Sequence, residues 1–183
     1  MDSKIKVKGE RLKVIVFGLL ALLMVGCKEN NWTEWKVQNE LWLANNIAND
    51  STVKVTASGL QYKILADPTP TDAKPNKTSY VTCDYTLQLI NGNVLEGGTD
   101  KAHGTFLLSS VISGFAEGCC LVHNNGDIRI FVPYYLGYDE AKVNDDDTYN
   151  AVGNEGTEGT HGYIPPYSTL IYDIHICAVS GSN

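Results

Sequence analysis

The sequence predicts an α+β fold in which an antiparallel sheet wraps over a single short helix. Several segments alternate apolar and polar residues with the period of a β-strand. Turn signals of the hairpin type, such as Asn91-Gly92, separate some of these segments and favour antiparallel neighbours. One short stretch, 111–118 (VISGFAEG), instead has helical spacing and carries an aromatic residue, Phe115. Many strands and one helix together indicate the α+β class.

The first 26 residues have the layout of a signal peptide. Five basic residues precede the apolar run 14–25, which is too short to span a bilayer comfortably. The following segment 23–27 (LMVGC) resembles the lipobox of bacterial lipoproteins, whose cysteine is lipid-modified and becomes N-terminal. We therefore expect a lipid on Cys27 that holds the chain at a membrane of the bacterial cell envelope, periplasmic or at the outer-membrane surface. A plain secretory signal or an uncleaved anchor is the alternative.

The charge of the remaining chain is strongly acidic. The whole sequence has 14 basic and 21 acidic side chains, of which 5 and 2 lie in the first 26 residues. The other 157 residues therefore hold 9 basic against 19 acidic side chains, a net charge of −10. This is enough chain for one domain and a short arm. An acidic domain of this kind argues against a nucleic-acid partner.

The cysteines and histidines show no metal-binding spacing. The cysteines after the predicted lipidation site are Cys83, Cys119, Cys120 and Cys177, and no Cys-x-x-Cys occurs. We expect buried free thiols, with Cys83 and Cys119 as the one pair to test for a disulfide, because both face the predicted core. The histidines are His103, His123, His161 and His175. None is predicted to bind a metal, and no cofactor is predicted.

Residues 27–57 are predicted to form a tether with a short amphipathic helix. Trp35, Trp42, Leu43 and Ile47 recur at helical intervals, and the polar segment 49–51 ends the pattern. Together with Trp32, these side chains give the arm a large apolar surface. Two interpretations stand: the helix binds a client or a second copy of the chain, giving a homodimer, or it folds back on the domain.

The domain is predicted to span 58–180 and to begin with a turn and a strand near 58–65. The clearest alternation follows at 81–89, where one face carries Val81, Cys83, Tyr85, Leu87 and Leu89. Asn91-Gly92 turns this strand back into 94–96, before a glycine pair at 97–98. Two later strands are predicted at 127–132 and 169–179. Their predicted core residues are Ile128, Ile130, Val132, Leu170, Tyr172, Ile174, Ile176 and Ala178.

The central helix is predicted within the stretch 111–118, and Cys119 continues its spacing. Ile112, Phe115 and Cys119 fall at positions i, i+3 and i+7, so all three should point inward. Ser113 is expected to cap the first amides of this helix, and Glu117 to suit its positive end.

Four blocks of the sequence resemble FKBP-type peptidyl-prolyl cis-trans isomerases, in particular the bacterial lipoprotein or Mip-like subgroup. They are 58–62 (SGLQY), 111–118 (VISGFAEG), 132–138 (VPYYLGY) and 164–173 (IPPYSTLIYD). The resemblance covers about 58–179, and the order of the blocks makes it specific. It implies a five-stranded antiparallel sheet curled around the helix, with a proline-binding pocket between them.

The resemblance also implies roles for ten residues of that pocket. The candidate catalytic residues are Tyr85, Glu96, Phe115 and Tyr138. The candidate substrate-binding residues are Leu95, Phe106, Val111, Ile112, Ile164 and Tyr172. Phe115 stands where the family usually has the Trp of the pocket floor, and Leu95-Glu96 where it usually has Phe-Asp. The Tyr138 hydroxyl and the Ile112 amide would donate hydrogen bonds to the carbonyl groups of a bound peptide.

An isomerase of this kind needs no nucleophile. Rotation about an X-Pro bond crosses a barrier of about 18–20 kcal/mol because amide resonance is lost. An apolar pocket that fits the twisted amide better than either planar form lowers this barrier. The predicted function is thus a prolyl isomerase, of reduced activity, that assists the folding of exported proteins. Its predicted partners are proline-containing peptides and unfolded exported proteins, with macrolide-type molecules as further pocket ligands.

Two departures from the family favour an alternative function, a non-catalytic proline-peptide-binding chaperone or surface adhesin. The first is the wall at 95–98, which the glycines Gly97 and Gly98 are expected to loosen. The second is the insertion 139–163, which is long, glycine-rich and acidic. Its spacing fails the EF-hand pattern, so we expect a mobile lid over the pocket mouth that disfavours acidic peptides.

Overall fold

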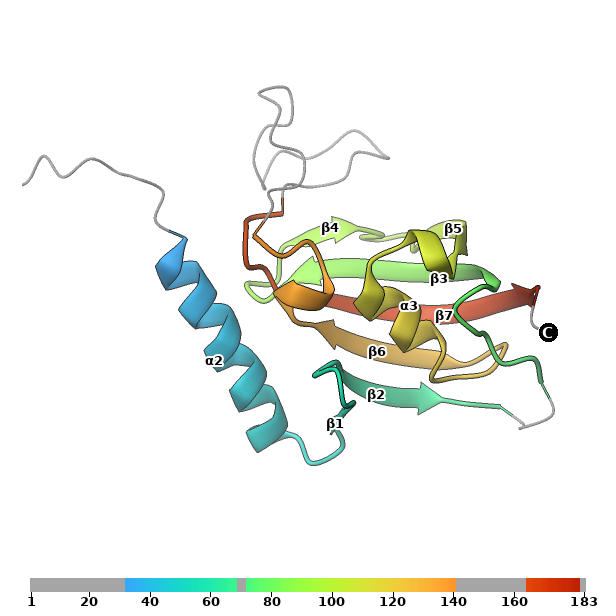
Figure 1. Ribbon diagram of the computed structural model, residues 1–183, viewed down its shortest axis with the longest axis horizontal. Coiled ribbons are helices and arrows are strands. Elements are labelled where there is room, and N and C mark those ends of the chain that lie inside the picture. Colours follow the sequence, from blue (N-terminus) through green and yellow to red (C-terminus); the bar gives the residue numbers. More distant parts are fainter. Residues whose placement is uncertain (1–31, 69–71, 141–163, 182–183) are drawn as a thin grey trace, which may run out of the picture. The chain divides into compact units, whose positions relative to one another are not determined.

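The computed structural model describes residues 32–68, 72–140 and 164–181 (Figure 1). The predicted signal peptide, Cys27, His161 and nearly all of the acidic insertion lie outside the described residues. The elements, in chain order, are α2 (Thr33–Asn49), β1 (Lys54–Val55), β2 (Gln61–Ala66), β3 (Tyr80–Leu89), β4 (Val94–Glu96), β5 (Ala102–Leu107), η1 (Leu108–Ser110), α3 (Ser113–Cys119), β6 (Asp127–Val132), η2 (Tyr134–Leu136) and β7 (Leu170–Ser180). Among them, no helix has the length and apolar character needed to cross a membrane.

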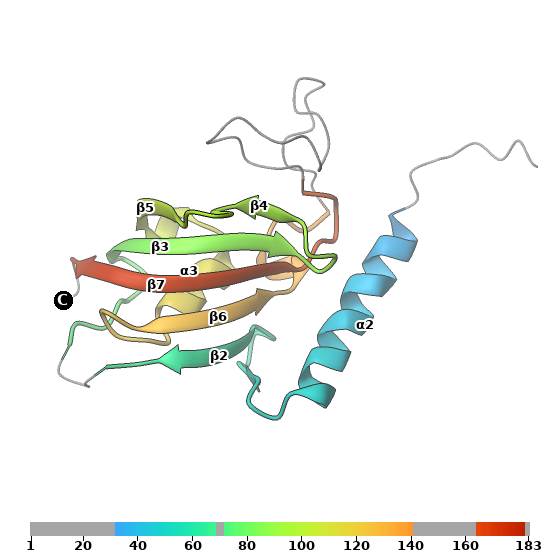
Figure 2. The ribbon, with the colours of Figure 1, turned by 180° about the vertical axis from the view of Figure 1, so that it is seen from behind.

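All strand pairs of the sheet are antiparallel. The strand order is β1-β2-β6-β7-β3-β4, and β5 also pairs with β3 (Figure 2). Because β4 and β5 pair with successive parts of the same edge of β3, they form one broken edge strand. This edge with β2, β3, β6 and β7 makes the five expected strands, and the two-residue β1 extends the other side. The predicted α+β class is therefore confirmed.

The core lies between the sheet and α3, which covers one face of it (Figure 1). The alternation predicted for β3 is confirmed, since its odd-numbered residues from Val81 to Leu89 are all buried. Phe115 and Cys119 point into the same core from α3, as their helical spacing predicts, while Ile112 is only half-buried. The face of the sheet away from α3 is called the outer face below.

The capping predicted for α3 is wrong. The N-cap residue is Ile112, which has no side chain to accept a hydrogen bond, and Ser113 is already the first helical residue. The Ser113 hydroxyl donates instead to the carbonyl of Leu136, at 3.2 Å. Glu117 lies beyond the first turn and accepts a 2.6 Å hydrogen bond from the Ser58 hydroxyl. Both polar side chains form hydrogen bonds with other segments of the domain, and neither caps the backbone amides at the start of α3.

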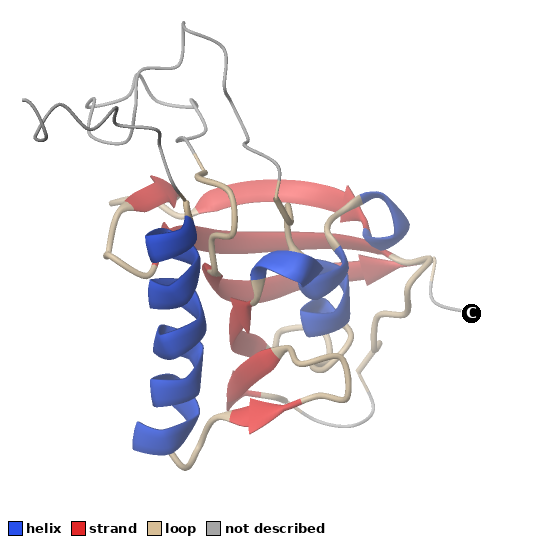
Figure 3. Ribbon diagram, turned by 60° about the vertical axis from the view of Figure 1, so that its left-hand side comes forward, coloured by secondary structure: helices blue, strands red, loops and turns tan. Residues whose placement is uncertain are grey.

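The predicted arm helix is confirmed as α2, and it folds back on the domain. It runs past the end of the sheet instead of over the face that α3 covers (Figure 3). The Trp35 indole donates to the Ser168 hydroxyl at 3.0 Å, and the rings of Trp42 and Phe131 lie 5.6 Å apart. Phe131 was expected on the polar face of its strand, but α2 buries it there. Ile47, expected on the packed face of the helix, is exposed.

The fully buried residue of α2 is Asn39, a polar residue. Its side chain has no exposed surface, accepts the Thr169 amide at 2.7 Å and donates to the Trp35 carbonyl at 2.8 Å. A search for periodically spaced apolar residues does not detect Asn39, because this residue is buried for its hydrogen bonds and not for its hydrophobicity.

A β-bulge near the end of β7 changes which residues face the core. Thr82 pairs with Ala178, but the next residue of β3, Cys83, pairs with Ile176, so Cys177 is an extra residue in β7. Ala178, predicted to face the core with Ile176, is therefore opposite Thr82 and exposed. Strict alternation predicts the wrong face beyond a bulge, because the extra residue shifts the period by one.

Candidate active site

Four of the predicted site residues bring their aromatic rings together over the core. Tyr85 comes from β3, Phe106 from β5, Phe115 from α3 and Tyr172 from β7. Phe115 lies at the centre, with its ring centroid 5.2 Å from Tyr172, 5.7 Å from Phe106 and 6.1 Å from Tyr85. These three contacts are edge-to-face, the arrangement that the charge distribution of aromatic rings favours. We call these four residues the aromatic cluster.

The hydroxyl of Tyr85 donates a hydrogen bond to the Glu96 carboxylate. Leu87 of β3 pairs with Glu96 of β4, so the hairpin holds the two side chains near one another. Burial raises the pKa of Tyr85, and the hydrogen bond to the Glu96 carboxylate raises it further. Tyr85 is therefore a neutral donor at any physiological pH.

Tyr138 follows η2 and is partly exposed beside the aromatic cluster. Burial raises its pKa, and the negative charge of Glu96 adds to the effect. The pKa of Tyr172 is raised well above its usual value by burial, again with contributions from Tyr138 and Glu96. The charge of Glu96 thus adds to the effect of burial on the pKa of Tyr85, Tyr138 and Tyr172. Tyr138 is 37% exposed, so part of this residue is open to solvent.

The remaining predicted site residues are apolar and adjoin the same core. Leu95 and Ile164 are buried within it, and Val111 and Ile112 are half-buried and packed against it. Ile164 is the first described residue after the insertion 139–163, and its side chain is part of the core. The structure thus brings all ten predicted residues to one region. Their separate roles remain predictions.

Gly97 has a structural role that the sequence analysis missed. Its φ is +68°, and a Cβ built on it would lie 2.3 Å from the Tyr85 carbonyl oxygen and 2.7 Å from the Ala102 amide nitrogen. The chain therefore passes tightly against β3 at the break between β4 and β5, where only glycine fits. The expected loosening at Gly97 is wrong, whereas Gly98 has open space around it.

A second glycine supports the cluster from β5. A Cβ on Gly104 would lie 2.7 Å from the nearest atom of the Phe106 ring, so the ring covers this glycine. Phe106 and Gly104 are two apart in the strand and share a face, a pairing that a sequence pattern could have indicated. The missing side chain leaves room for the ring to lie along the sheet.

The buried cysteines are free thiols. Cys83 and Cys119 are both buried, and none of the four described cysteines forms a disulfide. Burial raises the pKa of Cys83 to about 12 and that of Cys119 well above its usual value, so both stay protonated. A protonated, enclosed thiol is a poor nucleophile, and these two cysteines therefore serve the core as small apolar groups.

A family model for the FKBP-type peptidyl-prolyl cis-trans isomerase matches residues 71–177, more than half of the chain. The chain belongs to this family. The resemblance carried by the four sequence blocks is thereby confirmed. The matched span contains all ten predicted residues of the FKBP site, from Tyr85 to Tyr172.

Similar proteins include two bacterial relatives. The chain is 34% identical over 147 residues to the probable FKBP-type peptidyl-prolyl cis-trans isomerase FkpA of Neisseria meningitidis, covering 79% of this chain and 46% of the relative. It is 35% identical over 148 residues to the outer membrane protein MIP of Legionella longbeachae, covering 80% of this chain and 54% of that protein. The chain thus spans about half the length of these relatives.

Solved structures show the same fold. The crystal structure of FkpA from Escherichia coli is 22% identical and superposes with a TM-score of 0.64, covering 100% of this chain and 75% of that chain. A peptidyl-prolyl cis-trans isomerase from Pseudomonas syringae pv. tomato is 23% identical with a TM-score of 0.59, covering 81% of this chain and 96% of that one. An FKBP fold preceded by a helix is therefore shared with these structures.

Proposed function

We propose that this chain is a peptidyl-prolyl cis-trans isomerase that acts on X-Pro bonds of unfolded exported proteins. The observation that carries the proposal is the aromatic cluster, in which Phe115 makes edge-to-face contacts with three other rings. Membership of the FKBP family supports the same reaction.

The proposed mechanism is preferential binding of the twisted amide. The proline ring sits against Phe115, and the rings of Tyr85, Phe106 and Tyr172 keep water from its faces. A dry, apolar surface weakens the resonance form with separated charge, which lowers the barrier to rotation. A rate gain of about a million-fold requires only about 8 kcal/mol of preference for the transition state.

The flanking carbonyl groups of the peptide are held by hydrogen bonds. Tyr138 is the proposed donor from the partly open side, and the Ile112 amide is the proposed donor at the start of α3. Glu96 does not reach the substrate in this mechanism. It orients Tyr85 by accepting its hydrogen bond, and its charge adds to burial in raising the pKa of Tyr85 and Tyr138.

A protease-coupled assay on a Xaa-Pro peptide tests this proposal with the full chain. We expect cis-to-trans conversion faster than in buffer, and inhibition by a macrolide of the kind proposed to occupy the same pocket. A rate equal to that in buffer would reject the enzyme and leave the non-catalytic peptide-binding protein. Fluorescence titration with the same peptide would then show whether binding persists.

We also propose that the chain is anchored in the cell envelope through a lipid on Cys27. The lipobox-like segment 23–27 supports this, as does the name of the Legionella longbeachae relative, an outer membrane protein. Expression in a bacterium with labelled fatty acid should give a labelled protein that partitions into detergent. The Cys27→Ser variant should carry no label, and a labelled variant would reject the lipidation site.

A homodimer through α2 is the remaining proposed partner. Trp35 and Trp42 pack on the domain of their own chain, but Val37, Leu41 and Ile47 are exposed on this helix. Sedimentation of the full chain should show a dimer that Leu41→Lys dissociates. A wild-type monomer at high concentration would reject this assembly.

A further inference from the structure

The outer face of the sheet carries a row of alternating acids and histidines, on the side opposite the aromatic cluster. Asp127 of β6 pairs with His175 of β7, which pairs with Asp84 of β3, which pairs with His103 of β5. The His175 Nδ1 atom lies 3.0 Å from the Asp127 Oδ1 atom, and the His103 Nδ1 atom lies 2.5 Å from the Asp84 Oδ1 atom. Neither pair has a role in the proposed isomerase site.

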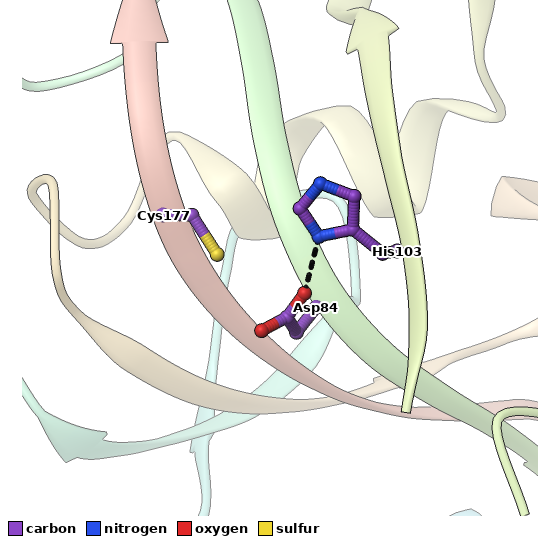
Figure 4. A group of neighbouring side chains, drawn as sticks. All are labelled: Asp84, His103 and Cys177. Atoms are coloured by element: carbon purple, nitrogen blue, oxygen red, sulfur yellow. Dashed lines mark hydrogen bonds and ion pairs between the residues drawn. The ribbon is translucent and has the colours of Figure 1, made fainter. Parts of the chain in front are cut away.

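The bulge in β7 adds a thiol to this row. Cys177 is the extra residue between the pairs Thr82–Ala178 and Cys83–Ile176, and its side chain lies beside Asp84 (Figure 4). One ligand atom from each of Asp84, His103 and Cys177 lies within 4.8 Å of the other two. Carboxylate, imidazole and thiol groups from three adjacent strands therefore converge at one place on the outer face.

We propose that Asp84, His103 and Cys177 form a binding site for a divalent cation of intermediate softness, with Zn²⁺ as the best match. Zn²⁺ binds sulfur, nitrogen and carboxylate oxygen, whereas Mg²⁺ and Ca²⁺ prefer oxygen alone. The presence of both a thiol and an imidazole beside one carboxylate is what favours Zn²⁺ here.

The geometry needs only small side-chain movements to hold the ion. With metal–ligand distances of about 2.0–2.3 Å, two ligands of a tetrahedral site lie about 3.3–3.7 Å apart. The Asp84–His103 pair must open by about 1 Å from its present 2.5 Å. The Cys177 sulfur already lies within 4.8 Å of both other ligand atoms and needs to approach by no more than about 1.5 Å. His103 is exposed and Asp84 and Cys177 are half-buried, so their side chains have room to rotate while the strands stay in place.

Charge is balanced at the proposed site by loss of a proton. Zn²⁺ displaces the proton of the Cys177 thiol, which passes to water, and the thiolate with the Asp84 carboxylate neutralises the ion. His103 binds as the neutral imidazole, through one ring nitrogen. Three protein ligands leave the fourth position to a water molecule, as in open zinc sites.

Sequence spacing could not reveal this site, because the donors are 19 and 74 residues apart and belong to three strands. Only the register of β3 with its two neighbours and the extra residue in β7 bring them together. An acid–histidine pair alone is common on protein surfaces. The Asp84–His103 pair differs from the Asp127–His175 pair in the same row because the bulge places the Cys177 thiol beside it.

The test uses the full chain, reduced and freed of metal with a chelator. Titration with Co²⁺ should produce a thiolate-to-metal absorption band, and Zn²⁺ should abolish that band by competition. Cys177→Ser should remove the band. His103→Asn deletes a direct ligand and should weaken Zn²⁺ binding in calorimetry by at least the 10–100-fold, roughly, that loss of an outer-shell partner costs. Zn²⁺ should raise the melting temperature of the wild type more than that of either variant.

Matched variants elsewhere serve as controls. Cys120→Ser and His123→Asn alter a cysteine and a histidine outside the site and should keep the band and the affinity. Both site variants should also keep the isomerase rate of the wild type, since the aromatic cluster lies on the other face of the sheet. Absence of the Co²⁺ band in the wild type, or a band and affinity unchanged in both site variants, would overturn the proposal.

Discussion

Tyr85 and Glu96 join two neighbouring strands of one hairpin through a hydrogen bond from phenol to carboxylate. The Tyr85 ring lies edge-to-face against Phe115 and Phe106. An acid of the β4 wall thus orients an aromatic residue of the core, and its charge also raises the pKa of Tyr138 after the effect of burial. Glu96 is one methylene longer than the usual acid of the family, and it reaches the hydroxyl.

Removing that bond should cost stability in a graded way. Tyr85→Phe deletes the donor and should lower the free energy of unfolding by about 1 kcal/mol, because it leaves the carboxylate without this partner. Glu96→Gln keeps an acceptor at the same place and should cost less. Urea denaturation of Tyr85→Phe, of Glu96→Ala, which removes the acceptor, and of their double variant measures the coupling energy between the two side chains. Additive losses would show that the bond contributes nothing.

Phe115 should matter for both stability and activity, but the two effects can be separated. Phe115→Ala removes a buried ring with three aromatic neighbours and should lower the free energy of unfolding by about 3–5 kcal/mol. Phe115→Leu keeps most of the volume and should cost roughly 1–2 kcal/mol. If the ring contacts the proline, the Phe115→Leu variant should remain folded and still lose most of its isomerase rate. A stable Phe115→Leu variant with the wild-type rate would exclude that contact.

Tyr138 is partly exposed, so its hydroxyl can be tested without disturbing the core. Tyr138→Phe should change the free energy of unfolding by less than about 0.5 kcal/mol. Its kcat/KM should fall about ten-fold, the effect of losing one transition-state hydrogen bond of about 1.4 kcal/mol. Because burial and the Glu96 carboxylate raise the pKa of Tyr138, the wild-type rate should not fall at the pH where a free tyrosine ionises, about 10. The prediction would be contradicted if the wild-type rate fell at or below a pH of about 10 while the rate of Tyr138→Phe did not.

The two adjacent glycines after β4 offer a matched pair of substitutions. Gly97→Ala places a methyl group 2.3 Å from the Tyr85 carbonyl oxygen at a positive φ and should destabilise the fold by more than about 2 kcal/mol. Gly98→Ala meets nothing within 4 Å and should change stability by less than about 0.5 kcal/mol. Thermal denaturation of both variants is the measurement. Equal effects would mean that the break between β4 and β5 tolerates side chains.

Asn39 should anchor α2 to the domain. Asn39→Ala leaves the buried amide of Thr169 without its acceptor and should cost about 1–3 kcal/mol. Asn45→Ala, on the exposed side of the same helix, is the matched control and should be neutral or slightly stabilising, because alanine favours a helix. Hydrogen exchange at the Thr169 amide should quicken in Asn39→Ala alone. Unchanged protection there would show that another group holds the helix.

Local patterns were enough to predict several elements and the region of the candidate site. The alternation of β3 depends only on a period of two, and the hairpin at Asn91-Gly92 on a glycine at positive φ, which the structure has at Gly92. Four ordered motifs indicated the family, and through it the residues that meet around Phe115. All of these signals are carried by neighbours along the chain.

Long-range contacts decided the rest. Phe131 is buried because α2 lies over it, Gly97 is required because β3 passes within reach of its missing side chain, and Cys177 approaches Asp84 because β7 holds one extra residue. In each case the deciding partner belongs to another strand or helix, and its distance depends on strand register and helix docking. The sequence alone therefore determined several elements and the family of this protein. Only the tertiary structure determined which polar and aromatic groups meet, because their contacts form between segments whose separation in the chain carries no periodic signal.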